Sequence, residues 1–142
     1  VHAYQFEPRG IGTYSTNREF WACIEGLADA VRAQAGYFDA EALRRPGGHW
    51  LDGYRTTGFF LQWLTTLRPD ALREFHVTVR DLEPWSFDGA MRAMFGPERG
   101  IERMWAEYQE FLAAEQAGAE RQMQAERQAG AQAEQRAQAA GR

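Results

Sequence analysis

Residues 20–31 read Phe-Trp-Ala-Cys-Ile-Glu-Gly-Leu-Ala-Asp-Ala-Val. Their large apolar side chains recur at the three- and four-residue spacing of an amphipathic helix. Thr16 and Glu19 precede them in the arrangement of a capping box, which satisfies free amide groups at the start of a helix. Gly36 marks the end. The stretch therefore predicts one helix that packs an apolar face against the rest of the protein.

Helical spacing of apolar residues continues along most of the chain. Further helices are predicted over about 54–67, from Asp70 through Val79, from Ser86 through Phe95 and from about Ile101 onward. Pro69 ends the first of these, because the residue before a proline disfavours helical backbone angles. Only the short segment 76–79 alternates as a strand does. We therefore predict a mainly α fold.

The composition changes at Ala113, where Ala, Gln, Glu and Arg begin to dominate. Met123 is the only large apolar residue that follows, so this segment favours helix by propensity but has no face to bury. We predict a domain at residues 1–112 and a low-complexity tail at residues 113–142, either helical and solvated or disordered. A coiled-coil partner for the tail is the alternative.

Two carboxylates interrupt the apolar helix. Glu25 and Asp29 are four residues apart and share one helix face. His2 precedes Glu25 by 23 residues and lies in Val-His-Ala-Tyr-Gln-Phe, at 1–6, which resembles the end of a helix that begins before Val1. One class of catalytic zinc site uses two histidines of a His-Glu-x-x-His helix and a glutamate from a later helix.

This pattern predicts a zinc site with His2 and Glu25 as ligands. Asp29 is predicted to hydrogen-bond the far nitrogen of a ligand histidine, which would fix its tautomer. The first histidine and the catalytic glutamate are expected just before Val1. The alternative is an exposed terminal histidine and a solvated pair of carboxylates.

Four further segments carry a family resemblance, in order and with plausible spacing over about residues 1–112. They are Ile24–Arg32 with Ala35-Gly36-Tyr37, His49-Trp50, Gly53–Leu61 and Met104–Tyr108. Together they resemble the plant basic secretory protein family, zincin-like proteins also found in bacteria and fungi and regarded as metallopeptidases. The chain departs from that family in lacking its first histidine and its catalytic glutamate.

The resemblance implies the helical C-terminal part of a zincin-like α+β domain, whose sheet would precede the zinc helix. It implies hydrolysis of peptide bonds in a peptide or protein substrate by zinc-activated water, and secretion or a place in the cell envelope. Because the first histidine and the glutamate are missing, residues 1–142 are expected to be inert and to bind zinc weakly.

Tyr54 is a candidate catalytic residue, because a tyrosine near zinc can stabilise the oxyanion that forms on the attacked carbonyl. A packing role with a hydrogen-bonded hydroxyl is the alternative. His49 is a loop histidine that could line a cleft, His76 is expected to be structural, and Cys23 is expected to be a buried small hydrophobe.

The formal net charge is −4, and the arginines are scattered among acidic residues rather than gathered in a stripe. The composition therefore predicts neither nucleic-acid binding nor membrane association. The rival hypothesis to a peptidase fragment is a non-catalytic all-helical scaffold or interaction module.

Overall fold

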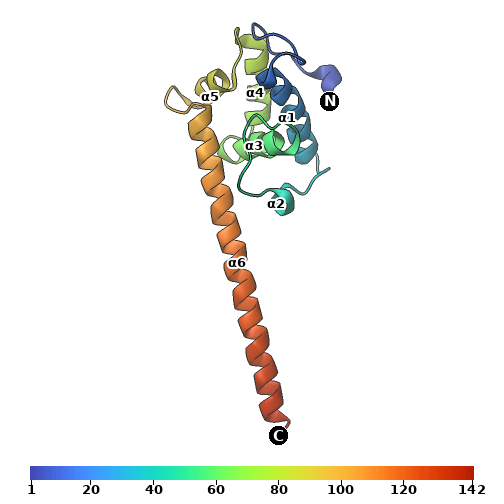
Figure 1. Ribbon diagram of the computed structural model, residues 1–142, viewed down its shortest axis with the longest axis vertical. Coiled ribbons are helices and arrows are strands. Elements are labelled where there is room, and N and C mark those ends of the chain that lie inside the picture. Colours follow the sequence, from blue (N-terminus) through green and yellow to red (C-terminus); the bar gives the residue numbers. More distant parts are fainter.

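The computed structural model describes residues 1–142 as six α-helices and one 3₁₀ turn, without a strand (Figure 1). The mainly α prediction is confirmed, and residues 76–79 are helical. The elements are η1 (His2–Tyr4), α1 (Arg18–Gln34), α2 (Ala40–Leu43), α3 (Tyr54–Leu67), α4 (Ala71–Asp81), α5 (Phe87–Phe95) and α6 (Ile101–Ala140).

The start of α1 differs from the predicted capping box by one residue. Asn17 is the cap, and its side-chain oxygen accepts the Phe20 amide at 3.0 Å. Thr16 instead bonds Thr13, and Glu19 accepts the Phe87 amide across the fold at 2.8 Å. Asparagine ranks above threonine as a cap, and Glu19 ties α1 to the start of α5.

The helices α1 and α3 pack at close range through two glycines. A Cβ atom at Gly26 would lie 2.7 Å from the Cβ of Thr57, and one at Gly58 would lie 2.9 Å from the Cβ of Asp29. Such separations are too short for real carbon atoms, so only glycine allows this approach. The close packing fixes α1, which carries both predicted carboxylates.

The core is rich in aromatic residues, and the first turns of α6 close one side of it. Its largest fully buried side chains include Trp85, Phe60, Phe75 and Phe87, and α6 adds Met104, Tyr108 and Leu112. Every residue from 119 onward is exposed, and α6 projects from the body as a single rod (Figure 1). No helix in the structure has both the length and the apolar character needed to cross a membrane.

The N-terminal segment lies against α1 and α4. Val1–Phe6 was predicted to end a helix, and the structure has the short 3₁₀ turn η1 there. The Phe6 ring stacks on His76 with centroids 4.5 Å apart, and the Phe6 amide donates to His76 Nε2 at 2.7 Å. His76 therefore has the structural role predicted for it, because it anchors the segment that carries His2.

Candidate metal site

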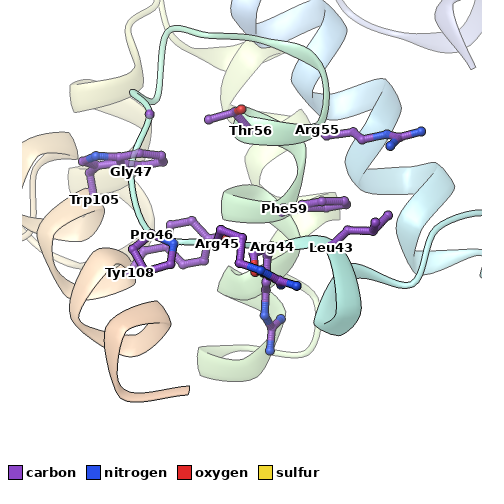
Figure 2. A pocket seen from close by; sticks show the side chains of 11 residues that line it. Leu43, Arg44, Arg45, Pro46, Gly47, Arg55, Thr56, Phe59, Trp105 and Tyr108 are labelled. Atoms are coloured by element: carbon purple, nitrogen blue, oxygen red, sulfur yellow. Dashed lines mark hydrogen bonds between the residues drawn. The ribbon is translucent and has the colours of Figure 1, made fainter. Parts of the chain in front are cut away.

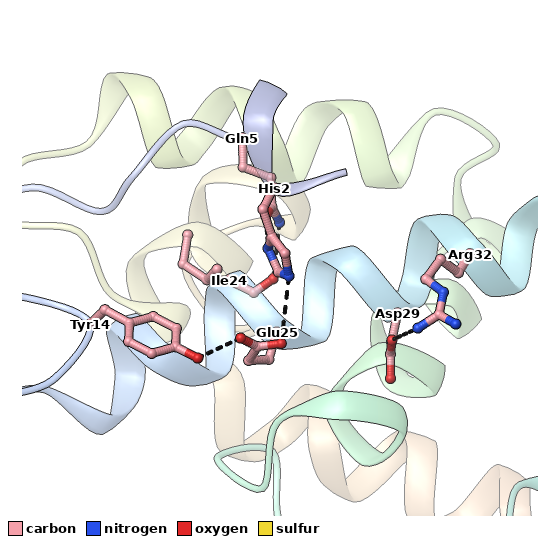
Figure 3. Close-up of polar contacts among 7 residues, drawn as sticks. All are labelled: His2, Gln5, Tyr14, Ile24, Glu25, Asp29 and Arg32. Atoms are coloured by element: carbon pink, nitrogen blue, oxygen red, sulfur yellow. Dashed lines mark hydrogen bonds and ion pairs between the residues drawn. The ribbon is translucent and has the colours of Figure 1, made fainter.

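His2 and Glu25 face each other across the gap between η1 and α1 (Figure 3). The imidazole Nε2 lies 3.7 Å from the Glu25 Oε2. The side chain of Glu25 is only 14% exposed, whereas that of His2 is 57% exposed. The sequence pattern thus identified two residues that the fold does bring together, although they are 23 positions apart.

Gln5 connects this histidine to α1. Its amide oxygen lies 2.7 Å from His2 Nδ1, and its amide nitrogen donates to the Ile24 carbonyl at 3.0 Å. Sequence reasoning missed Gln5, although its spacing of three residues from His2 is one at which side chains meet in a helical turn.

Tyr14 holds the other side of Glu25. Its hydroxyl donates to the Glu25 Oε1 at 2.5 Å (Figure 3). This hydrogen bond to a carboxylate raises the pKa of Tyr14, because losing the proton would leave two anions in contact. Tyr14 lies in a loop without helical periodicity, so no sequence signal pointed to it.

The His2 nitrogen and the Glu25 oxygen match zinc in ligand type and in spacing. Zinc binds imidazole nitrogen and carboxylate oxygen at about 2.0–2.2 Å, so two tetrahedral ligands lie about 3.4 Å apart. The observed 3.7 Å needs only a small adjustment. No group of three or more His, Cys, Asp or Glu side chains in the structure is placed to hold a metal, so the arrangement supplies two ligands.

Asp29 lies one turn further along α1 and faces away from His2 (Figure 3). The residue is 7% exposed, and its Oδ1 accepts from Arg32 at 3.1 Å. No hydrogen bond joins Asp29 to His2, whose Nδ1 is bonded to Gln5 instead. A role of Asp29 toward a different histidine stays a prediction.

Tyr54 is the first residue of α3 and lies beside α1. Its ring meets Trp21 edge to face at a centroid separation of 5.4 Å, and the residue is 54% exposed. Its φ of 44° lies in the left-handed region, which is uncommon for residues other than glycine and costs backbone strain. Tyr54 makes no bond to Glu25 here, and its catalytic role stays a prediction.

The remaining candidates lie apart from this pair. His49 Nδ1 accepts the Leu51 amide at 3.1 Å within its own loop. Cys23 is 1% exposed, as predicted for a buried small hydrophobe. Burial raises the pKa of its thiol well above the ordinary value, which disfavours a nucleophilic thiolate.

A separate pocket of about 340 Å³ lies between the end of α2 with the loop that follows it, α3 and α6. Figure 2 shows Arg55, Thr56 and Phe59 from α3 and the rings of Trp105 and Tyr108 from α6 around it. Neither His2 nor Glu25 lines this pocket, so the pocket is not part of the candidate metal site.

A family model described as the peptidase of plants and bacteria matches residues 1–108. The chain belongs to this family. The match confirms the resemblance to basic secretory proteins and supports a peptidase-related function with peptide or protein substrates. No curated protein and no solved structure matches the chain at a significant level.

Proposed function

We propose that the chain provides two zinc ligands, His2 and Glu25, to a zinc-dependent peptidase of this family. The observation that carries the proposal is the 3.7 Å separation between the His2 Nε2 and the Glu25 Oε2. At that distance the imidazole nitrogen and the carboxylate oxygen are close enough to bind one cation between them. Zinc is the cation that best suits this pair of donors in a peptidase.

The chain's own residues would shape the site. Tyr14 orients Glu25 toward His2 by bonding its other carboxylate oxygen. The close packing of α1 against α3 fixes the position of the Glu25 backbone. Bound zinc would act as a Lewis acid and lower the pKa of a water molecule that attacks the peptide carbonyl. A histidine and a general-base glutamate from a His-Glu-x segment joined to Val1 would complete the pattern. Without such a segment, residues 1–142 should be inert.

The test joins the upstream part of a family zincin domain, ending in His-Glu-x, directly to Val1. This extended protein should contain about one zinc per chain and should hydrolyse peptides. Glu25→Ala should remove most of the bound zinc, since a tetrahedral site with three protein ligands would lose one of them. Glu110→Ala is the matched control, because Glu110 is an exposed glutamate on α6.

Asp29→Ala should have a milder effect, about a 10–100-fold loss of zinc affinity, which is usual when a residue that supports a ligand is removed. Equal zinc content in the Glu25→Ala and parent proteins would show that another residue is the third ligand. Absence of zinc from every extended protein would favour the non-catalytic helical module.

A further inference from the structure

The side-chain amide of Gln5 bonds in two directions at once. One end lies 2.7 Å from Nδ1 of the His2 ring, and the other donates to the carbonyl of Ile24 at 3.0 Å. Ile24 is the residue directly before Glu25 on α1. A single amide therefore bridges one proposed ligand and the helical turn that presents the other (Figure 3).

The backbone carbonyl determines which way this amide points. A carbonyl oxygen only accepts hydrogen bonds, so the Gln5 nitrogen must face Ile24 and the Gln5 oxygen must face His2. An amide oxygen also only accepts. The Nδ1 atom of His2 must therefore carry a hydrogen, and in the neutral ring Nε2 then carries the lone pair.

We propose that Gln5 is the positioning residue that holds His2 in the tautomer able to bind a metal through Nε2, with that atom directed at Glu25. The metal-binding part of this inference rests on the proposed function, whereas the tautomer does not. The side chain of His2 is 57% exposed, and its only other polar contact is the one with Glu25 at 3.7 Å. Gln5 is thus the main restraint on a ring that would otherwise rotate in solvent.

The tautomer can be measured by ¹⁵N NMR of the imidazole in residues 1–142, without any metal. The spectra would be recorded at about pH 8.5, above the range in which ordinary histidines titrate. Gln5→Met removes both hydrogen bonds while keeping the length of the side chain. Gln34→Met is the matched control, because Gln34 is an exposed residue at the end of α1.

The parent chain and Gln34→Met should show a protonated Nδ1 and an unprotonated Nε2 at His2. Gln5→Met should change His2 to mostly Nε2–H, the form that free imidazole side chains favour. Gln5→Glu, which keeps an acceptor for the ring but loses the bond to the Ile24 carbonyl, should retain the Nδ1–H form. A parent chain with Nε2–H at His2, or a folded Gln5→Met chain that keeps Nδ1–H, would overturn the proposal.

The second readout is zinc affinity in the extended protein that carries His-Glu-x before Val1. Gln5→Met should weaken zinc binding about 10–100-fold, and Gln34→Met should leave it unchanged. Unchanged affinity in Gln5→Met would remove the metal-binding part of the inference. If the parent extended protein bound no zinc, the proposed function would fail, whereas the tautomer measured in residues 1–142 would still decide whether Gln5 orients His2.

Discussion

His76 holds the N-terminal segment through its neutral ring. Its Nε2 accepts the Phe6 amide at 2.7 Å, and a protonated ring has no acceptor to offer. Partial burial, with a smaller effect from the Arg80 guanidinium, lowers the pKa of His76. Asp81 offsets that positive charge in part through its ion pair with Arg80.

Stability should therefore fall on mild acidification. A histidine whose pKa is lowered by folding contributes fully to the free energy of unfolding above its ordinary pKa of about 6.5. That contribution is lost as the pH falls below this value. We expect a loss below about 1 kcal/mol between pH 8 and pH 5.5, since the ring is only half-buried. Urea unfolding at both pH values would measure it.

The control for this effect is a second histidine substitution. His76→Gln should reduce the pH dependence between pH 8 and pH 5.5, whereas His49→Gln should not, because His49 is exposed. A pH dependence that is the same in both variants and in the parent would show that His76 is not the group responsible.

At the scale of single helices, periodicity and caps were enough to predict most elements. Ser86 caps α5 and accepts the Gly89 amide at 2.9 Å. Asp70 stands at the cap position of α4, but its side chain makes no capping bond. Thr16 and Asn17 stand side by side and both belong to residue types that cap helices, and in the structure Glu19 bonds α5 instead of completing a capping box with Thr16. That contact depends on tertiary structure, which local pattern cannot reveal.

Gly26→Ala tests the close contact of α1 with α3. The new Cβ would collide with Thr57, which is held by hydrogen bonds to Trp50 and Gly53 and cannot easily move. Overpacking of this kind costs about 1–3 kcal/mol, against at most about 1 kcal/mol gained from helix propensity. We expect a net loss in the free energy of unfolding, measured by denaturant titration.

Gly130→Ala is the matched substitution in α6, where nothing lies within 4 Å of the added carbon. It should leave the stability of the body unchanged. If Gly26→Ala were as harmless as Gly130→Ala, the two helices would be further apart in solution than in the structure.

At the scale of the whole molecule, the exposed rod of α6 begins later than composition alone suggests. Arg44 is 9% exposed in its side chain and donates to Glu115 at 2.8 Å. Glu115 therefore belongs to the packed body, although it lies within the Ala- and Gln-rich segment.

Two truncations should separate the rod from the body. Ending the chain after Gly118 removes only exposed residues, so the melting temperature should stay within a few degrees. Ending it after Ala114 also removes Glu115, the partner of Arg44. The melting temperature should then fall, because hydrogen bonds to charged groups contribute about 1.5–3 kcal/mol. Equal melting temperatures would mean that this ion pair adds nothing, and a large loss after Gly118 would mean that the rod has a partner.

The candidate site shows the same limit of sequence reasoning. Glu25 could be predicted because a carboxylate in an apolar helix is unusual, and His2 because residues 1–6 resemble the end of a zinc-binding helix. Tyr14 and Gln5 could not be predicted, because each is an ordinary polar residue until the fold places it against a proposed ligand. The sequence therefore predicted the pair but not the residues that orient it.

The central claim is that His2 and Glu25 bind zinc together, and a zinc titration of residues 1–142 followed by ¹⁵N NMR tests it most directly. We predict weak binding, with the largest shift at the His2 Nε2 and little change at His49 or His76. Glu25→Gln should weaken that response by at least about tenfold, since it removes the charged ligand. A response centred on His49 or His76, or one at His2 that Glu25→Gln leaves unchanged, would contradict the account.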